Sequence, residues 1–190
     1  MNRIVNFSRM SDSSREDWLL VNSAVIEYDN NYSYRILEMF SRLRGVHFAH
    51  PVDMYQHGLQ TATRALRDGA DEEKVVVALL HDVGEVLCPE NHAAMTAEWL
   101  RPYISEHNYW LVKYHGLFQG YYYLHHFNRD KNARDLHSDH PMYQATIDFC
   151  ENWDQKAFDP NYDTLPLSEF EPMVHRLFAN KPAMHAVLGI

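Results

Sequence analysis

The chain has 190 residues, 46% of them hydrophobic, and a formal net charge of −9 at pH 7, so we expect a single domain with one core over residues 1–190. The negative charge argues against nucleic acid or an anionic membrane as a partner, because both require clustered lysine and arginine. No apolar stretch approaches a membrane span, the first 14 residues are too polar for a signal peptide, and two cysteines suit a reducing compartment, so we expect a cytoplasmic protein.

The first part of the chain predicts two helices and a loop. Ser13 and Glu16 have the spacing of a capping box, which predicts a helix that begins there and runs to about Tyr28. Apolar residues at helical spacing predict a second helix over residues 34–44. The segment 46–51 (VHFAHP) is expected to be a loop.

Four more helices are expected before residue 116. Apolar residues recur at intervals of three or four over residues 52–68. Asp71 is suited to be the N-cap of a helix that runs to about Leu87. Further helices are expected over residues 90–100 and 105–115.

The remainder of the chain alternates loops and helices. Residues 116–139 are rich in Tyr, His, Asn and Asp and have no clean period, which predicts an active-site loop with one helical turn around residues 120–126. Helices are expected over residues 141–156 and 168–178, with a loop at 159–166. Because no segment predicts a strand, the fold class is expected to be all-α.

A pair of adjacent metal-binding side chains, His81 and Asp82, ends the apolar run 75–80. Burying such groups is costly unless something binds them there. The other candidates each lie on a separate predicted helix, and four histidines with two aspartates suffice for two divalent ions of iron, manganese or zinc. The six predicted ligands are His57, His81, Asp82, His92, His115 and Asp154.

The six residues can be divided between two ions. Neighbouring residues on a helix point about 100° apart, so we expect His81 to bind one ion while the Asp82 carboxylate bridges both. His57 and Asp154 would complete the first set. His92 and His115 would hold the second ion and leave positions open for water, oxygen or substrate.

These segments resemble the HD-domain superfamily, helical metalloproteins with the pattern H…HD…D. The matching segments are QHGLQ (56–60), ALLHDVG (78–84), His92 with AEWL (97–100), His115, and NWD (152–154). The spacings between the ligands look most like those of the small mixed-valent di-iron oxygenases, which include organophosphonate dioxygenases and inositol oxygenase. The resemblance covers residues 51–159, and it implies an HD-domain helical bundle with a dinuclear metal site at its centre.

The resemblance also implies an activity. It implies two iron ions in the Fe(II)/Fe(III) state and O2 as co-substrate, with cleavage at a carbon that carries a hydroxyl group. His47 and His50 lie where these oxygenases place a gate over the iron. We therefore regard both, with Glu85, as catalytic candidates.

The chain departs from the phosphonate enzymes where they contact the phosphonate. Glu85 stands where a basic or neutral donor is expected, Gln119 where a lysine is expected, and Glu151 where an arginine is expected. Two acids and an amide would repel a dianion, unless Lys156 or another nearby cation (Lys113, Arg129 or Lys131) takes over.

The acidic replacements favour a small polar substrate with an amine or quaternary ammonium group. Tyr121, with Tyr122, Tyr123 or Trp153, would form an aromatic wall that attracts the cation. The substrate-binding candidates are Glu151, Gln119, Tyr121 and Lys156. We expect a small-molecule substrate and a protein that is a monomer or a homodimer.

Two other interpretations remain open. One is a metal-dependent phosphohydrolase acting on a nucleotide or phosphate ester, because an acid three residues after the HD aspartate is common in the one-metal nucleotidases. Those enzymes do not need His92 and His115. The other is a non-catalytic helical module with a structural metal, although structural sites tend to be closed and rich in cysteine.

Overall fold

The computed structural model describes residues 4–179, and within that range the protein is all-α, as the sequence predicts. Short 3-10 turns join the helices, and the described residues form no strand. The eight α-helices are α1 (Arg15–Asp29), α2 (Tyr32–Ser41), α3 (Met54–Arg67), α4 (Glu72–Leu80), α5 (His92–Leu100), α6 (Glu106–Tyr123), α7 (Tyr143–Asn152) and α8 (Leu167–Ala179).

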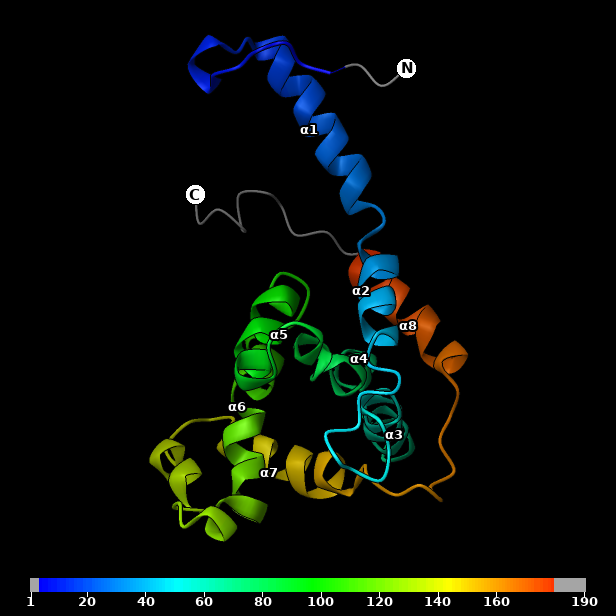
Figure 1. Cartoon of the computed structure of the whole chain (residues 1–190), viewed down its shortest axis with the longest axis vertical. Coiled ribbons are helices and arrows are strands. Elements are labelled where there is room, and N and C mark those ends of the chain that lie inside the picture. Colours follow the sequence, from blue (N-terminus) through cyan, green and yellow to red (C-terminus); the bar gives the residue numbers. More distant parts are fainter. Residues whose placement is uncertain (1–3, 180–190) are drawn as a thin grey trace.

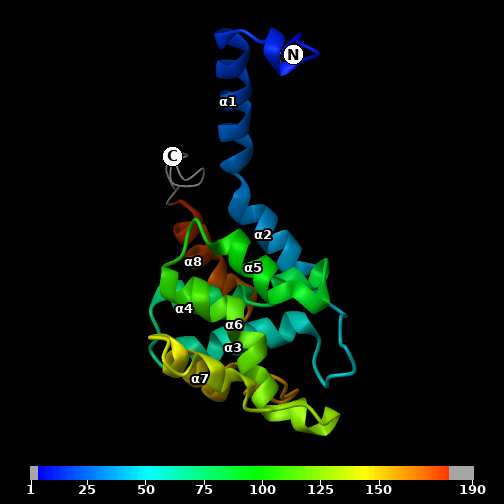
Figure 2. The same ribbon diagram turned by 90° about the vertical axis from the view of Figure 1, so that its left-hand side faces the viewer.

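Seven of these helices form a bundle, and α1 projects from it (Figures 1 and 2). Within the bundle α3 packs along α4, α5 along α6, and α8 against both α2 and α4. The core is built from large apolar side chains that are almost fully buried, including Phe40, Leu79, Phe118, Phe149 and Phe170. None of the described helices is both long and apolar enough to cross a membrane.

The close approach of α3 to α4 depends on Gly58. A Cβ atom at this position would lie 2.6 Å from Cε2 of Phe40 and 2.7 Å from the carbonyl oxygen of Leu79. Glycine is therefore needed at this position, and its presence lets the two helices pack with their backbones close together. The contact brings His57, the neighbour of Gly58, towards the end of α4.

Two predicted helices end earlier than expected. The α-helix predicted to run to Leu87 ends at Leu80, and a 3-10 turn, η2 (Val83–Val86), follows. The cause is tertiary: Gly84 N–H donates to Oγ1 of Thr96 (2.9 Å), and the backbone of Gly84 packs against that of His92. The helix predicted to run to residue 156 likewise ends at Asn152.

The loop predicted for residues 116–139 is wrong in its first third, where α6 continues to Tyr123. Leu111, His115 and Phe118 are buried along one face, so helical spacing persists beneath the polar composition of this segment. Two 3-10 turns, η4 (Leu124–Phe127) and η5 (Ala133–His137), follow it.

The first helix is capped one residue later than predicted. Ser14 and Asp17, rather than Ser13 and Glu16, form the capping box, because Ser13 instead accepts a hydrogen bond from Nε1 of Trp18 (2.7 Å). The predicted N-cap of α4 is confirmed, since the Asp71 side chain accepts a hydrogen bond from Lys74 N–H (2.8 Å).

Candidate metal centre

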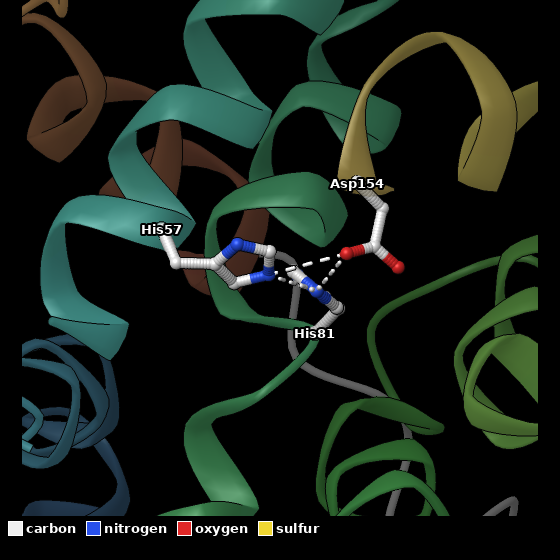
Figure 3. Close-up of side chains that lie close together, drawn as sticks. All are labelled: His57, His81 and Asp154. Atoms are coloured by element: carbon white, nitrogen blue, oxygen red, sulfur yellow. Dashed lines mark hydrogen bonds and ion pairs between the residues drawn. The ribbon is translucent and has the colours of Figure 1, made fainter. Parts of the chain in front are cut away.

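The structure brings all six predicted ligands to one place. His57 comes from α3, His92 and His115 from α5 and α6, and Asp154 from the turn after α7. His81 and Asp82 follow the last residue of α4, so the end of the α-helix lets both side chains turn towards the same point. Figure 3 shows three of these residues, His57, His81 and Asp154, directed at one another from different segments.

We call His57, His81 and Asp154 the inner set. Nε2 of His57 lies 3.2 Å from Nε2 of His81 and 3.2 Å from Oδ1 of Asp154. Oδ2 of Asp82 lies 3.2 Å from Nε2 of His57 and 3.1 Å from Nε2 of His81. Atoms with these separations can all lie about 2 Å from one central point, which matches the bond lengths of zinc to nitrogen and oxygen ligands.

We call His92 and His115 the outer set. Their Nε2 atoms are 3.3 Å apart, and Oδ1 of Asp82 lies 3.2 Å from the first and 3.0 Å from the second. Asp82 therefore faces the inner set through Oδ2 and the outer set through Oδ1, which is the arrangement of a bridging carboxylate.

Each of the four imidazole rings is held by a hydrogen bond from Nδ1 to a backbone carbonyl oxygen. The acceptors are Ala157 (3.2 Å), Ala78 (2.9 Å), Pro89 (2.6 Å) and Val112 (2.7 Å), for His57, His81, His92 and His115 respectively. Because a carbonyl oxygen can only accept, Nδ1 carries the proton, and a neutral ring presents the lone pair of Nε2 to the centre of the cluster. Metal-binding histidines are commonly oriented in this way.

Two features of the cluster fit a bound cation. The lone pairs of neutral His57 and His81 would repel each other across 3.2 Å unless a positive charge lies between them. Oδ2 of Asp154 is buried and has no hydrogen-bond partner, which is costly for a carboxylate. The set of imidazole and carboxylate donors suits divalent iron, manganese or zinc, so these residues could hold a metal.

The charges of the cluster depend on one another. Burial lowers the pKa of His57, but hydrogen bonds to Asp154 and Asp82 outweigh it and raise the pKa to about 9. His92 follows the same balance, and its hydrogen bond to Asp82 helps to raise its pKa to about 9. Burial raises the pKa of Asp82, yet the charge of His81 holds it well below the usual range. A metal ion would supply this positive charge and release protons on binding.

A cavity of about 290 Å³ opens onto the cluster. Besides cluster residues and Gly116, it is lined by Phe48, His50, Met54, Glu85, Gln119, Tyr122, Tyr123, Gln155 and Phe158. Among these described residues there is no lysine or arginine, whereas Asp82, Glu85 and Asp154 are acids. The cavity therefore combines an acidic floor with aromatic walls.

The two histidines of the predicted gate lie in different places. His50 lines the cavity, and its ring lies 4.5 Å from that of Phe158, which stacks on His57 at 4.4 Å. His47 instead lines a separate hollow beside Gln60, so the structure does not place it at the cavity. The chain reverses between the two at Phe48 and Ala49, which have positive φ values of 44° and 66° and are strained for residues other than glycine.

Of the predicted substrate-binding residues, only Gln119 lines the cavity. Gln119 and Tyr122 share the face of α6 that carries His115, while Tyr121 is turned away beneath Arg134, whose Cζ lies 3.8 Å from its ring centre. Glu151 and Lys156 are exposed. The place of Tyr121 depends on the continuation of α6, which the expected loop left open, whereas Glu151 lies on α7 and Lys156 in the turn after it.

Besides Gly116, the prediction also missed four lining residues, Phe48, Met54, Gln155 and Phe158. Spacing could have found three of them. Met54 lies one helical turn before His57, Gln155 directly follows Asp154, and Phe158 lies four residues after Asp154. Phe48 carried no such signal, because loop 46–51 has no regular period.

Glu85 lies at the outer set. Oε1 is 3.8 Å from Nδ1 of His92, and Oε2 is buried without a hydrogen-bond partner. Burial and the nearby charge of Asp82 raise the pKa of Glu85 to about 7. Glu85, Asp82 and His92 each offer a donor atom within 4.8 Å of the others, so Glu85 could also act as a metal ligand.

The fold and the site together define an all-α protein with a buried histidine–aspartate cluster that could hold a metal ion. Compared with known protein families and with curated proteins, the chain matches none.

Proposed function

We propose that this protein is a non-haem di-iron oxygenase. It would use O2 to oxidise and cleave a small polar molecule at a carbon that carries a hydroxyl group, and the molecule would also carry an amine or quaternary ammonium group. The observation that supports this most is the position of Asp82, whose two oxygens face two separate ligand sets beside an acidic cavity.

The residues present fit two ions. The inner set with Oδ2 of Asp82 would hold one, and the outer set with Oδ1 would hold the other. Such a pair, when bound, supplies redox chemistry towards O2 and lowers the pKa of a coordinated hydroxyl group. The same six residues carry the resemblance of the sequence to the HD-domain oxygenases.

The chain's own residues would select the substrate. Oε2 of Glu85 is buried and lacks a partner, so an ammonium group in the cavity would satisfy it. The aromatic rings of Tyr122 and Phe48 would stabilise a cation and exclude water from its alkyl groups. A cavity of about 290 Å³ suits a small molecule.

The alternative is a metal-dependent phosphohydrolase, and the position of Glu85 favours it. Its carboxylate lies beside the outer set with a pKa of about 7, where it could accept a proton from an attacking water. Against this function, the cavity offers a phosphate no lysine or arginine among its described lining residues. We therefore place the oxygenase first.

Purified protein supplied with iron distinguishes the two functions. We expect Mössbauer and EPR spectra of a coupled iron pair, and oxygen consumption with a panel of hydroxylated amines and quaternary ammonium alcohols. The matched assay measures phosphate release from nucleotides and phosphodiesters. Protein that contains no iron pair and releases phosphate would overturn the oxygenase proposal in favour of the alternative.

A further inference from the structure

Helix α1 is exposed on all sides in the described part of the chain. It has 15 residues, none of them buried, and it projects from the bundle (Figures 1 and 2). Several of its large apolar side chains are 43–64% exposed: Trp18, Leu19, Val25, Ile26 and Tyr28. Clustered exposed apolar side chains of this kind mark an interaction surface more often than a solvated one.

The length of α1 also argues for a partner. Isolated helices of about 12–15 residues are marginal in water, and most helical stability in proteins comes from packing an apolar face. The capping box of Ser14 and Asp17 fixes where α1 begins but supplies only local stabilisation. Packing against another surface would supply the rest.

The same chain carries a matching surface on the bundle. A groove of about 340 Å³ runs beside α2 and is lined by apolar parts of Tyr32, Ile36, Met39 and Trp99. Arg35 and Arg42 also line it. Its apolar lining suits the apolar face of a helix.

The charges of the two surfaces are complementary. Helix α1 carries four acids (Glu16, Asp17, Glu27 and Asp29) against one base, Arg15. The groove has two arginines and one acid: Arg42 is paired with Glu38 at 2.9 Å, and Arg35 stacks on Tyr28 of its own α1 at 3.7 Å, so the groove keeps a net charge of one positive unit. An acidic, partly apolar helix is therefore the kind of partner that this groove would attract.

We propose that α1 of one chain packs into the α2 groove of a second copy, so that two chains exchange these helices in a homodimer. In Figures 1 and 2, α1 runs from the N-terminal end of α2 away from the bundle, and the ring centre of Tyr28 in its last turn lies 3.7 Å from Cζ of Arg35 in its own groove. Each chain has one helix to donate and one groove to accept it. A two-fold axis satisfies both contacts at once and closes the assembly. This proposal does not depend on the proposed activity.

The oligomeric state of the full chain tests the proposal. We expect a dimer by analytical ultracentrifugation, and Ile26→Glu in α1 or Met39→Glu in the groove should each give a folded monomer, with folding checked by circular dichroism. Leu136→Glu is the matched control, because Leu136 is exposed in η5 and far from both surfaces in sequence. A monomeric unsubstituted protein, or a dimer that survives Met39→Glu, would overturn the exchange.

Cross-linking distinguishes helix exchange from simple pairing of two α1 helices. In a Cys88→Ser background, where the remaining Cys150 is buried, chains with Ile26→Cys are mixed with chains with Met39→Cys and treated with a short bis-maleimide. The exchange predicts a cross-link between the two different chains. A cross-link formed by Ile26→Cys chains alone, with none in the mixture between unlike chains, would instead show that α1 pairs with α1.

Discussion

The inner and outer sets share Asp82 but differ in how the chain surrounds them. His57, His81 and Asp154 of the inner set are at most 2% exposed, and the rings of Phe158 and Phe149 pack on its two histidines. In the outer set His115 is as buried, but the His92 side chain is 19% exposed, and residues of both sets line the cavity. A closed set retains its ion, whereas an open set can exchange a ligand for water or substrate. Under the proposed function, this difference would give the inner set a structural role and the outer set the chemistry.

Removing the shared residue should have the largest effect, because it damages both sets. We expect Asp82→Ala to lose both ions and all activity, with the metal per chain measured by plasma mass spectrometry. His81→Ala should likewise abolish activity and metal content. Glu90→Ala serves as the control, since Glu90 is an exposed acid outside the cluster. Full metal content in Asp82→Ala would refute its role as a bridge.

Removing an outer ligand alone should separate the two sets. We expect His92→Ala to retain the inner ion, so that about half the metal remains per chain, with loss of activity. The same metal analysis, supported by EPR of the remaining iron, checks this. If His92→Ala loses all its metal, the division into two sets is wrong.

Two glycines support the two sets separately. A Cβ at Gly58 would meet the backbone of α4 near His81, whereas one at Gly84 would lie 2.6 Å from the carbonyl oxygen of His92. Overpacking of this kind costs about 1–3 kcal/mol. We expect Gly58→Ala and Gly84→Ala both to lower the free energy of unfolding measured in urea, but only Gly84→Ala to weaken the outer ion selectively.

Gly116→Ala is the matched control for both variants. Gly116 lies within α6, and a Cβ there meets no atom within 4 Å. Because alanine favours a helix over glycine by about 1 kcal/mol, this variant should be as stable as the natural protein or more so. A loss of stability equal to that of Gly58→Ala would show that the close contacts do not explain the effect.

The smallest effect should come from the acid beside the outer set. If Glu85 recognises a cationic group, Glu85→Gln should raise KM several-fold and change kcat less, with both ions retained. Glu151→Gln is the control, because Glu151 is exposed and does not line the cavity. Loss of the outer ion in Glu85→Gln would show that Glu85 is a metal ligand instead.

The sequence by itself determined the all-α class and the positions of the helices, because these depend on local signals: apolar spacing, caps such as Asp71, and glycine or proline at the ends. It also singled out the six cluster residues, since His81 and Asp82 follow an apolar run that predicts burial and each of the other four lies on a separate predicted helix. Patterns that repeat along the chain are visible without knowing how the helices pack.

Only the tertiary structure decided where α4 ends, how far α6 continues, and which side chains line the cavity. The hydrogen bond from Gly84 to Thr96 ends α4 through a residue of another helix, so no local pattern predicts it. The helical spacing of Leu111, His115 and Phe118 is present in the sequence, but only their burial shows that α6 continues there. The same holds for Tyr121 and Tyr122, neighbours of identical chemistry, of which Tyr122 lines the cavity and Tyr121 does not. Their difference is set by the rotation of α6 against its neighbours, which is a property of packing.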